Sequence, residues 1–205
     1  MHDLNHHGFL LHSTLVVTPS KVPLGLLDQQ IIYRDEKDFG KKHDRKKRPI
    51  DEKESYKWLK SLDVVAEAQK NHSSTLIVNV ADRESDIYDY FVHAQELDNQ
   101  AVLIRGAWNR CIEDEQNYLW KYIESQDEAG TLSVEVPRKP GQAVRTANLS
   151  LRYGHVILKP PKHRVKEHLP LVKIDVVLAR EDNPPSGIKA IEWLLLTTVS
   201  VNSLD

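Results

Sequence analysis

The sequence predicts an α/β fold in which a mixed sheet with flanking helices is followed by an inserted, antiparallel β-rich lobe. Two observations lead to this class. Residues 1–107 alternate between apolar, β-branched runs and amphipathic helical periodicity, which is typical of a sheet with crossover helices. Residues 108–190 combine weak helical periodicity with frequent Pro and Gly and short alternating runs. We therefore expect a core over 1–107, a β-rich insertion over 108–190 and a strand returning to the core over 191–205.

Each element of the first part follows from its local pattern. A helix near 52–69 begins with proline and acidic residues, and its apolar residues recur at helical spacing. A second helix near 85–97 follows a short β-branched run, which indicates a central parallel strand buried on both faces. We expect one sheet from four strands: Phe9–Val17, Pro23–Tyr33, Thr75–Ala81 and Ala101–Arg105.

The β-rich part is expected to pack as a separate lobe, with no long helix between residues 130 and 180. Tyr153-Gly154 has the composition of a hairpin turn between two of its strands. A last apolar strand over 193–198 returns to the core. The predicted strands of the lobe are Thr131–Val136, Ala147–Arg152, His155–Lys159 and Leu171–Leu178.

Composition narrows the class of protein. The chain has 205 residues, of which 40% are hydrophobic and 28% charged, with a formal net charge of −2. These values are typical of a folded globular protein and exclude a disordered or collagen-like chain. A single cysteine, Cys111, excludes a disulfide framework. The sequence offers neither a signal peptide nor a membrane-length apolar run, so we expect a cytoplasmic protein without membrane contact.

Charge is distributed unevenly along the chain. Residues 82–128 carry twelve acidic and four basic side chains, whereas residues 137–173 carry nine basic side chains and one acid, Glu167. A second basic run occupies residues 41–48. Basic segments in a balanced protein indicate a surface for phosphates, and the alternative for residues 41–48 is a solvated loop. The segment Lys159–Arg164 is interpreted as a DNA-backbone contact or as an exposed hairpin end.

The segment Asp82–Asp86 lies between a predicted buried strand and a helix, where open α/β sheets carry ligands and catalytic groups. A carboxylate at this point can hold a divalent cation such as Mg²⁺ and support phosphoryl transfer. The alternative is that Asp82 or Ser85 caps the helix, and Glu84 and Asp86 complement its dipole.

Five segments carry a resemblance to a known family: His7–Ser13, Val22–Leu26, Glu52–Leu59, Ala81–Tyr88 and Trp193–Thr197. They resemble bacterial insertion-sequence DDE transposases of the branch that includes the transposon-five enzyme. The resemblance runs in order over essentially the whole chain. It implies a ribonuclease H-like mixed sheet, incomplete here, with a β-rich insertion between the second and third catalytic acids.

The resemblance also implies roles for three residues. Asp82 matches the family's second catalytic carboxylate, and so a metal ligand. Arg105 matches a basic residue near transposon-end DNA, and Trp193 matches a tryptophan on which a flipped base stacks. The alternatives are a surface charge for Arg105 and a core aromatic for Trp193. The implied partner is double-stranded DNA, and the implied cofactor of the intact enzyme is Mg²⁺ or Mn²⁺.

The chain also departs from the family pattern. The strand with the first aspartate and the helix with the third acid have no match in it, and Asp3 is not assigned the first role. The DNA-binding and dimerisation regions at the two ends of the family enzymes also have no match. We therefore expect an interior piece of a transposase, which binds metal weakly and does not cleave DNA alone.

Two further functions stay open from the residues themselves. One is a non-catalytic DNA-binding fragment that interferes with an intact transposase. The other is a metal-dependent phosphohydrolase that uses Asp82 and Asp86, which would require both carboxylates to face one cleft. The remaining candidates, interpreted as surface histidines and an unreactive thiol, are His6, His7, His12 and Cys111.

Overall fold

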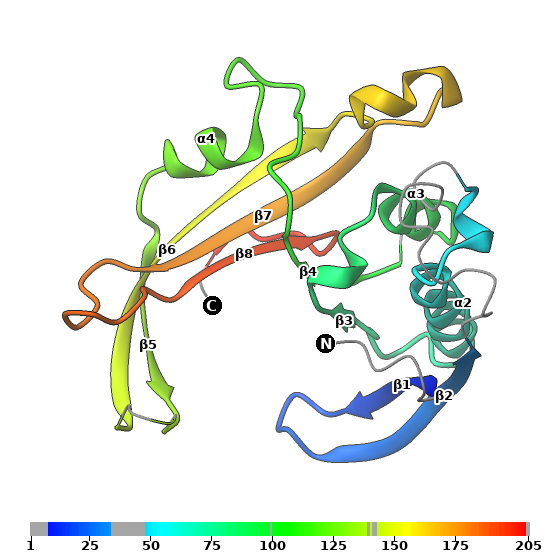
Figure 1. Ribbon diagram of the computed structural model, residues 1–205, viewed down its shortest axis with the longest axis horizontal. Helices are drawn as coiled ribbons and strands as arrows, with labels where there is room; N and C mark the ends of the chain where they lie inside the picture. The colour runs from blue at the N-terminus through cyan, green and yellow to red at the C-terminus, as the bar shows by residue number, and fades with distance from the viewer. Residues whose placement is uncertain (1–7, 34–47, 99, 139, 141–142, 204–205) are drawn as a thin grey trace. The chain divides into compact units, whose positions relative to one another are not determined.

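The computed structural model describes residues 8–33, 48–98, 100–138, 140 and 143–203 (Figure 1). The chain divides into two compact units, residues 1–77 and residues 78–205, and each is described by itself. Of the basic run 41–48, only Arg48 belongs to the described residues. None of the helices in the described part is both long and apolar enough to span a membrane.

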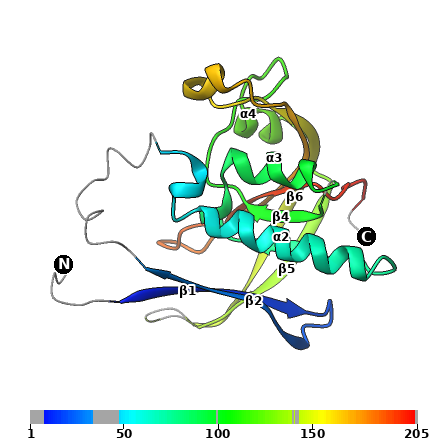
Figure 2. The same cartoon turned by 90° about the vertical axis from the view of Figure 1, so that its right-hand side faces the viewer.

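The first unit is an antiparallel hairpin with a helix along one face (Figure 2). Side chains alternate across the strands, so His12 and Thr14 share a face, and both contact the buried hydroxyl of Ser61 on the helix. The amide of Gln30 donates to the same hydroxyl at 3.0 Å. The elements are β1 (Phe9–Val17), β2 (Pro23–Tyr33), η2 (Ile50–Glu52) and α2 (Tyr56–Asn71). They confirm both predicted strands and the first predicted helix.

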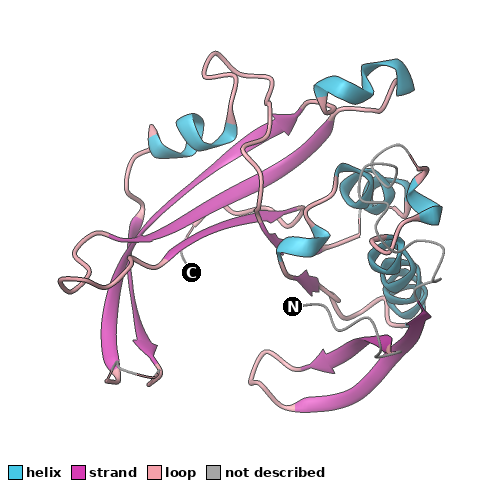
Figure 3. Ribbon diagram, viewed as in Figure 1, coloured by secondary structure: helices cyan, strands magenta, loops and turns pink. Residues whose placement is uncertain are grey.

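The second unit is a mixed α/β structure around a six-stranded sheet in the order β3-β4-β8-β7-β6-β5. β3 and β4 are parallel, and the other neighbouring pairs are antiparallel (Figure 3). The strands are β3 (Asn79–Ala81), β4 (Val102–Arg105), β5 (Gly130–Val136), β6 (Arg145–Leu158), β7 (Val172–Glu181) and β8 (Glu192–Thr197). The helical elements are η3 (Arg83–Ser85), α3 (Tyr88–Glu96), α4 (Leu119–Glu124) and η4 (Lys162–Glu167).

The core of the second unit is built from one apolar face of the sheet and from α3 and α4. Burying each such side chain stabilises the fold by roughly 1.5–3 kcal/mol. The fully buried side chains include Phe91, Ile104, Leu119, Ile123, Leu158, Leu178 and Leu196. These residues come from α3, from α4 and from four consecutive strands of the sheet, β4, β8, β7 and β6.

The prediction of one sheet from the first four strands is wrong. β1 and β2 form a two-stranded sheet, while β3 and β4 belong to the six-stranded sheet. The predicted strand at 75–81 is also shorter, because the side chain of Gln69 binds the backbone of Thr75 and Ile77 and ties this segment to the end of α2. β3 is an edge strand, and Val80 is 68% exposed instead of buried.

The β-rich part is not a separate sheet. β7 pairs with β8 along six residues, so β5, β6 and β7 continue the sheet of β3 and β4. The expected hairpin turn at Tyr153-Gly154 is wrong, because both residues lie inside the continuous strand β6. Gly154 serves close packing instead, since a Cβ atom there would lie 2.7 Å from the hydroxyl oxygen of Tyr122.

Candidate functional site

Asp82 and Arg105 end two neighbouring parallel strands. Asp82 follows β3 directly, and Arg105 is the last residue of β4. The register pairs Ala81 with Ile104, so Asp82 and Arg105 are the next residues along their strands. Both therefore lie at the carboxyl edge of the parallel pair, the position at which open α/β sheets carry ligands.

The local structure of Asp82 satisfies the capping interpretation. Its backbone is extended, and its Oδ1 atom accepts a hydrogen bond of 2.9 Å from the amide of Glu84. The hydroxyl of Ser85 donates to the Asp82 carbonyl at 2.7 Å. Asp82 is exposed, and the cap uses one carboxylate oxygen, so the second can still contact a cation or a donor.

Arg105 and Trp193 form a cation–π pair across two antiparallel strands. Arg105 pairs with Leu195, and Trp193 lies two residues earlier in β8, on the same face as Leu195. The Arg105 guanidinium carbon is 5.5 Å from the centre of the Trp193 ring. Trp193 is 48% exposed, whereas the flanking core residue Leu194 is buried, so Trp193 is not enclosed as a core aromatic.

Arg105 also carries an unused donor. Among the buried side-chain nitrogen and oxygen atoms of the described residues, its Nε is one of those without a hydrogen-bond partner. Buried polar groups are nearly always hydrogen-bonded, so such a donor requires an explanation. Protein atoms cover this nitrogen, so a ligand acceptor could reach it only after the Arg105 side chain moves.

Asp86 is a structural centre and not a second site carboxylate. It is 1% exposed, and its Oδ2 accepts from the amides of Ala107 at 2.6 Å and Trp108 at 3.0 Å. Its Oδ1 accepts from two guanidinium nitrogens of Arg110. Both oxygens are thus occupied by donors of the segment after β4, which leaves none for a cation beside Asp82. The phosphohydrolase alternative required Asp86 as a second metal-binding carboxylate beside Asp82, and Asp86 is not available for that role.

Trp108 is a candidate that our sequence interpretation missed. Its amide is held by Asp86, while its side chain is 64% exposed, three residues after Arg105. The sequence did contain a signal for it. Trp108 lies in a segment without helical or strand periodicity, so the pattern predicts no buried face for its large apolar ring. Its position makes it an exposed aromatic near the carboxyl edge of β4.

The described residues do not by themselves fit a divalent metal centre. They include no group of three or more His, Cys, Asp or Glu side chains arranged to hold an ion. Asp82 supplies one carboxylate, while Mg²⁺ prefers octahedral oxygen ligands with one or two carboxylates fixed in position.

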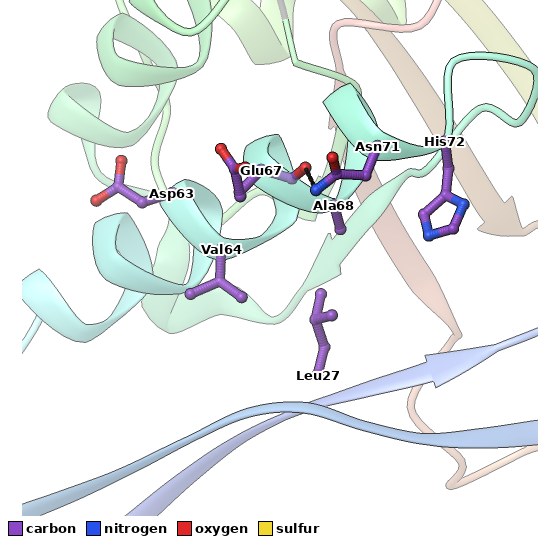
Figure 4. Close-up of a pocket in the computed structure, with 7 residues that line it drawn as sticks. All are labelled: Leu27, Asp63, Val64, Glu67, Ala68, Asn71 and His72. Carbon is purple, nitrogen blue, oxygen red and sulfur yellow. Dashed lines mark hydrogen bonds between the residues drawn. The ribbon is translucent and has the colours of Figure 1, made fainter.

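The other candidates lie elsewhere. His12 contacts Ser61 and the Trp58 ring in the first unit, Cys111 pairs through its backbone with Tyr118, and His6 and His7 are outside the described residues. A shallow open groove of about 510 Å³ runs between β2 and α2. None of the predicted site residues lines this groove. Figure 4 shows the residues that do: Leu27, Asp63, Val64, Glu67, Ala68, Asn71 and His72.

No protein-family model matches the chain.

Proposed function

We propose that this chain is a part of a DNA transposase of the DDE type. We propose that Arg105 binds double-stranded DNA beside Asp82, and that Trp193 stacks on a base flipped out of the DNA end. The intact enzyme would cleave and transfer strands at transposon ends. The 205-residue chain carries a match to one of the three catalytic carboxylates, so we propose that it does not cut DNA alone.

One observation carries this proposal. The resemblance in sequence requires Asp82, Arg105 and Trp193 to act on the same DNA end, although 111 residues separate the first from the last. Asp82 and Arg105 end adjacent parallel strands, and Trp193 contacts Arg105 from the next strand. A merely local sequence likeness gives no reason for these three side chains to gather at one end of three neighbouring strands.

The chemistry of the three side chains fits a nucleic-acid end. Arg105 offers a permanently charged guanidinium, a group that suits phosphate oxygens. Trp193 offers a half-exposed indole, on which an unstacked base gains about 1–3 kcal/mol. Asp82 offers one carboxylate oxygen, which in the intact enzyme would join further acids around Mg²⁺ or Mn²⁺, the ions that polarise the scissile phosphate.

The first test concerns binding. Fluorescence anisotropy with a labelled duplex of about 30 base pairs measures affinity between about 50 and 200 mM salt, the range in which phosphate contacts weaken steeply. We expect Arg105→Ala to weaken binding and to lower the salt dependence by about one phosphate contact. Lys189→Ala, which removes an exposed basic residue of the same unit outside residues 137–173, is the control and should bind like the parent.

The second test concerns cleavage. The purified chain and its Asp82→Ala variant are incubated with supercoiled plasmid and Mg²⁺ or Mn²⁺. We expect both to leave the plasmid intact and to retard it equally at low salt. Cleavage by the parent that is lost in the variant would contradict the proposed inactivity, and failure of the parent to bind any duplex would contradict the proposed function.

A further inference from the structure

The connection between β6 and β7, residues 159–171, concentrates positive charge. It carries four Lys or Arg side chains and two histidines against a single acid, Glu167. The functional site described above uses none of these residues. The sequence alone leaves open whether this connection is a loose hairpin end or a built surface.

Both ends of the connection are fastened to the start of α3. The hydroxyl of Tyr88, which is 2% exposed, donates to the carbonyl of Pro170 at 2.6 Å and lies 3.2 Å from the carbonyl of Leu158. One buried side chain thereby joins the residue that ends β6 to a residue just before β7. The connection is thus closed at its base by a tertiary contact.

The middle of the connection is fastened by Arg164. Its guanidinium binds the Asp89 carboxylate in a two-point contact at 2.6 and 2.8 Å, and it also binds Glu167. These hydrogen bonds raise the pKa of the Arg164 guanidinium, so it stays charged. Two carboxylates therefore surround one positive charge, which makes Arg164 a structural anchor and not a free cation.

Three other residues of η4 could contact a phosphate. Lys162, His163 and Lys166 are exposed. The Lys162 ammonium lies 3.3 Å from the hydroxyl of Tyr118 and 5.7 Å from the centre of its ring. This hydrogen bond raises the pKa of Lys162, which therefore keeps its positive charge.

The anchor also locates the connection relative to Asp82. Tyr88 and Asp89 form the first turn of α3, and α3 begins soon after Asp82 and η3. Figures 1 and 2 show the helical turn of η4 above α3. The exposed lysines of η4 thus lie on an element fixed to the first turn of α3, the helix that follows Asp82 and η3 along the chain.

We propose that this connection is a phosphate-binding surface for duplex DNA, in which Lys162, His163 and Lys166 contact the backbone beside the Asp82, Arg105 and Trp193 group. The inference rests on the proposed function and adds a second contact region to it. Phosphate contacts carry no sequence information and need only positive charge held in position. The lysines supply the charge, and the Tyr88 and Arg164 anchors hold the connection in position.

The test compares two double variants with equal loss of charge. Lys162→Ala with Lys166→Ala removes the two exposed lysines of η4, and Lys121→Ala with Lys189→Ala removes two exposed lysines elsewhere in the same unit. Anisotropy with the labelled duplex gives the slope of log affinity against log salt for each. We expect the η4 variant to lower this slope by about two, one for each phosphate contact, and the control to keep the parent's slope.

Each outcome bears on the inference. Equal slopes for the two double variants would overturn it, and if Arg105→Ala still weakens binding, the proposed function stands without it. A parent chain that binds no duplex would overturn both. Because all four lysines are exposed, circular dichroism should report an unchanged fold, and the charge-reversed pair Lys162→Glu with Lys166→Glu should weaken binding further.

Discussion

Asp82 and Asp86 illustrate how two carboxylates of one short segment acquire different roles. Asp82 is exposed and caps η3 with one oxygen, whereas Asp86 is buried and accepts from two amides and from Arg110. The difference arises because η3 turns the chain between them. Asp86 thereby fixes the segment that follows Arg105, and Asp82 stays open to solvent.

The buried role of Asp86 predicts a large loss of stability on its removal. Asp86→Ala leaves the Arg110 charge without its partner in a buried position, so the free energy of unfolding should fall by about 3–5 kcal/mol. Urea denaturation followed by circular dichroism measures this change. Asp82→Ala is the control and should cost no more than about 1 kcal/mol, the usual value of a cap. Equal stabilities of the two variants would contradict the structural role of Asp86.

Trp193 and Trp108 allow a matched test of base stacking. Both are exposed tryptophans of the second unit, but only Trp193 has a role implied by the resemblance. We expect Trp193→Ala to weaken binding of a duplex with one unpaired base roughly fivefold to 150-fold, the equivalent of 1–3 kcal/mol. The affinity for a perfectly paired duplex should change little. If Trp108→Ala gives the larger loss, the stacking residue is Trp108.

At the scale of elements, β6 depends on a contact that its local sequence does not reveal. The strand passes the Tyr122 side chain at Gly154, and the Tyr122 hydroxyl donates to the carbonyl of His155 at 3.0 Å. This contact places α4 against the long strands β6 and β7. Glycine is therefore required in mid-strand by close approach and not by a turn.

A double-mutant cycle tests this packing. Gly154→Ala should lower the free energy of unfolding by about 1–3 kcal/mol, because its new methyl group meets the Tyr122 ring. Combined with Tyr122→Ala, the same substitution should cost much less, since the obstructing ring is gone. Gly8→Ala, where no atom lies within 4 Å of the added Cβ, is the control. Additive losses in the cycle would show that the two residues do not clash.

The Tyr88 anchor of the β6–β7 connection predicts a pH dependence. Burial raises the pKa of Tyr88 to about 12, and the positive charge of Arg110 lowers it in part. Because the folded pKa exceeds the usual value near 10, the folded protein retains a proton that the unfolded chain loses. Stability contributed by this group is therefore complete below about pH 10 and declines between about pH 10 and 12.

Measurement of unfolding free energy from neutral to alkaline pH checks this expectation. Tyr88→Phe should lower stability at neutral pH, since the hydrogen bond to Pro170 is lost, and should make the alkaline decline less steep. Burial raises the pKa of Tyr90 as well, so part of the decline should remain. An unchanged alkaline slope in Tyr88→Phe would contradict the assignment.

At the scale of the whole molecule, every residue proposed to contact DNA belongs to the second unit. Arg105, Trp193 and the β6–β7 connection all lie within residues 78–205, and the six-stranded sheet is hydrogen-bonded within that unit. The basic run at 41–48 belongs to the first unit and lies, apart from Arg48, outside the described residues.

This division predicts that residues 78–205 carry DNA binding. Produced alone, the segment should unfold cooperatively and bind the labelled duplex with nearly the affinity of the full chain. Circular dichroism establishes the fold, and anisotropy measures the affinity. A folded segment whose affinity is tenfold or more weaker would instead assign a major contact to residues 1–77, where the basic run at 41–48 is the candidate.

Local patterns predicted the elements near the expected residues. The apolar periodicity of α2, the apolar runs of β1 and β2 and the alternation in β5 indicate these elements without any tertiary information. The position of Asp82 at a strand end also follows from sequence, since a β-branched run ends just before it. The mixed α/β class was predicted correctly for the same reason.

Strand partners and side-chain contacts were decided only by the tertiary structure. Whether β3 is central or at an edge depends on hydrogen bonds between segments far apart in sequence, and alternation within one strand carries no information about its neighbours. Three side-chain contacts likewise depend on residues far apart in sequence. Arg105 contacts Trp193, Asp86 binds Arg110, and Gly154 leaves room for Tyr122. By itself the sequence determined which residues carry charge, aromatic surface and periodicity, whereas folding determined which of them meet, because packing and electrostatic contacts act over ångströms in space and not along the chain.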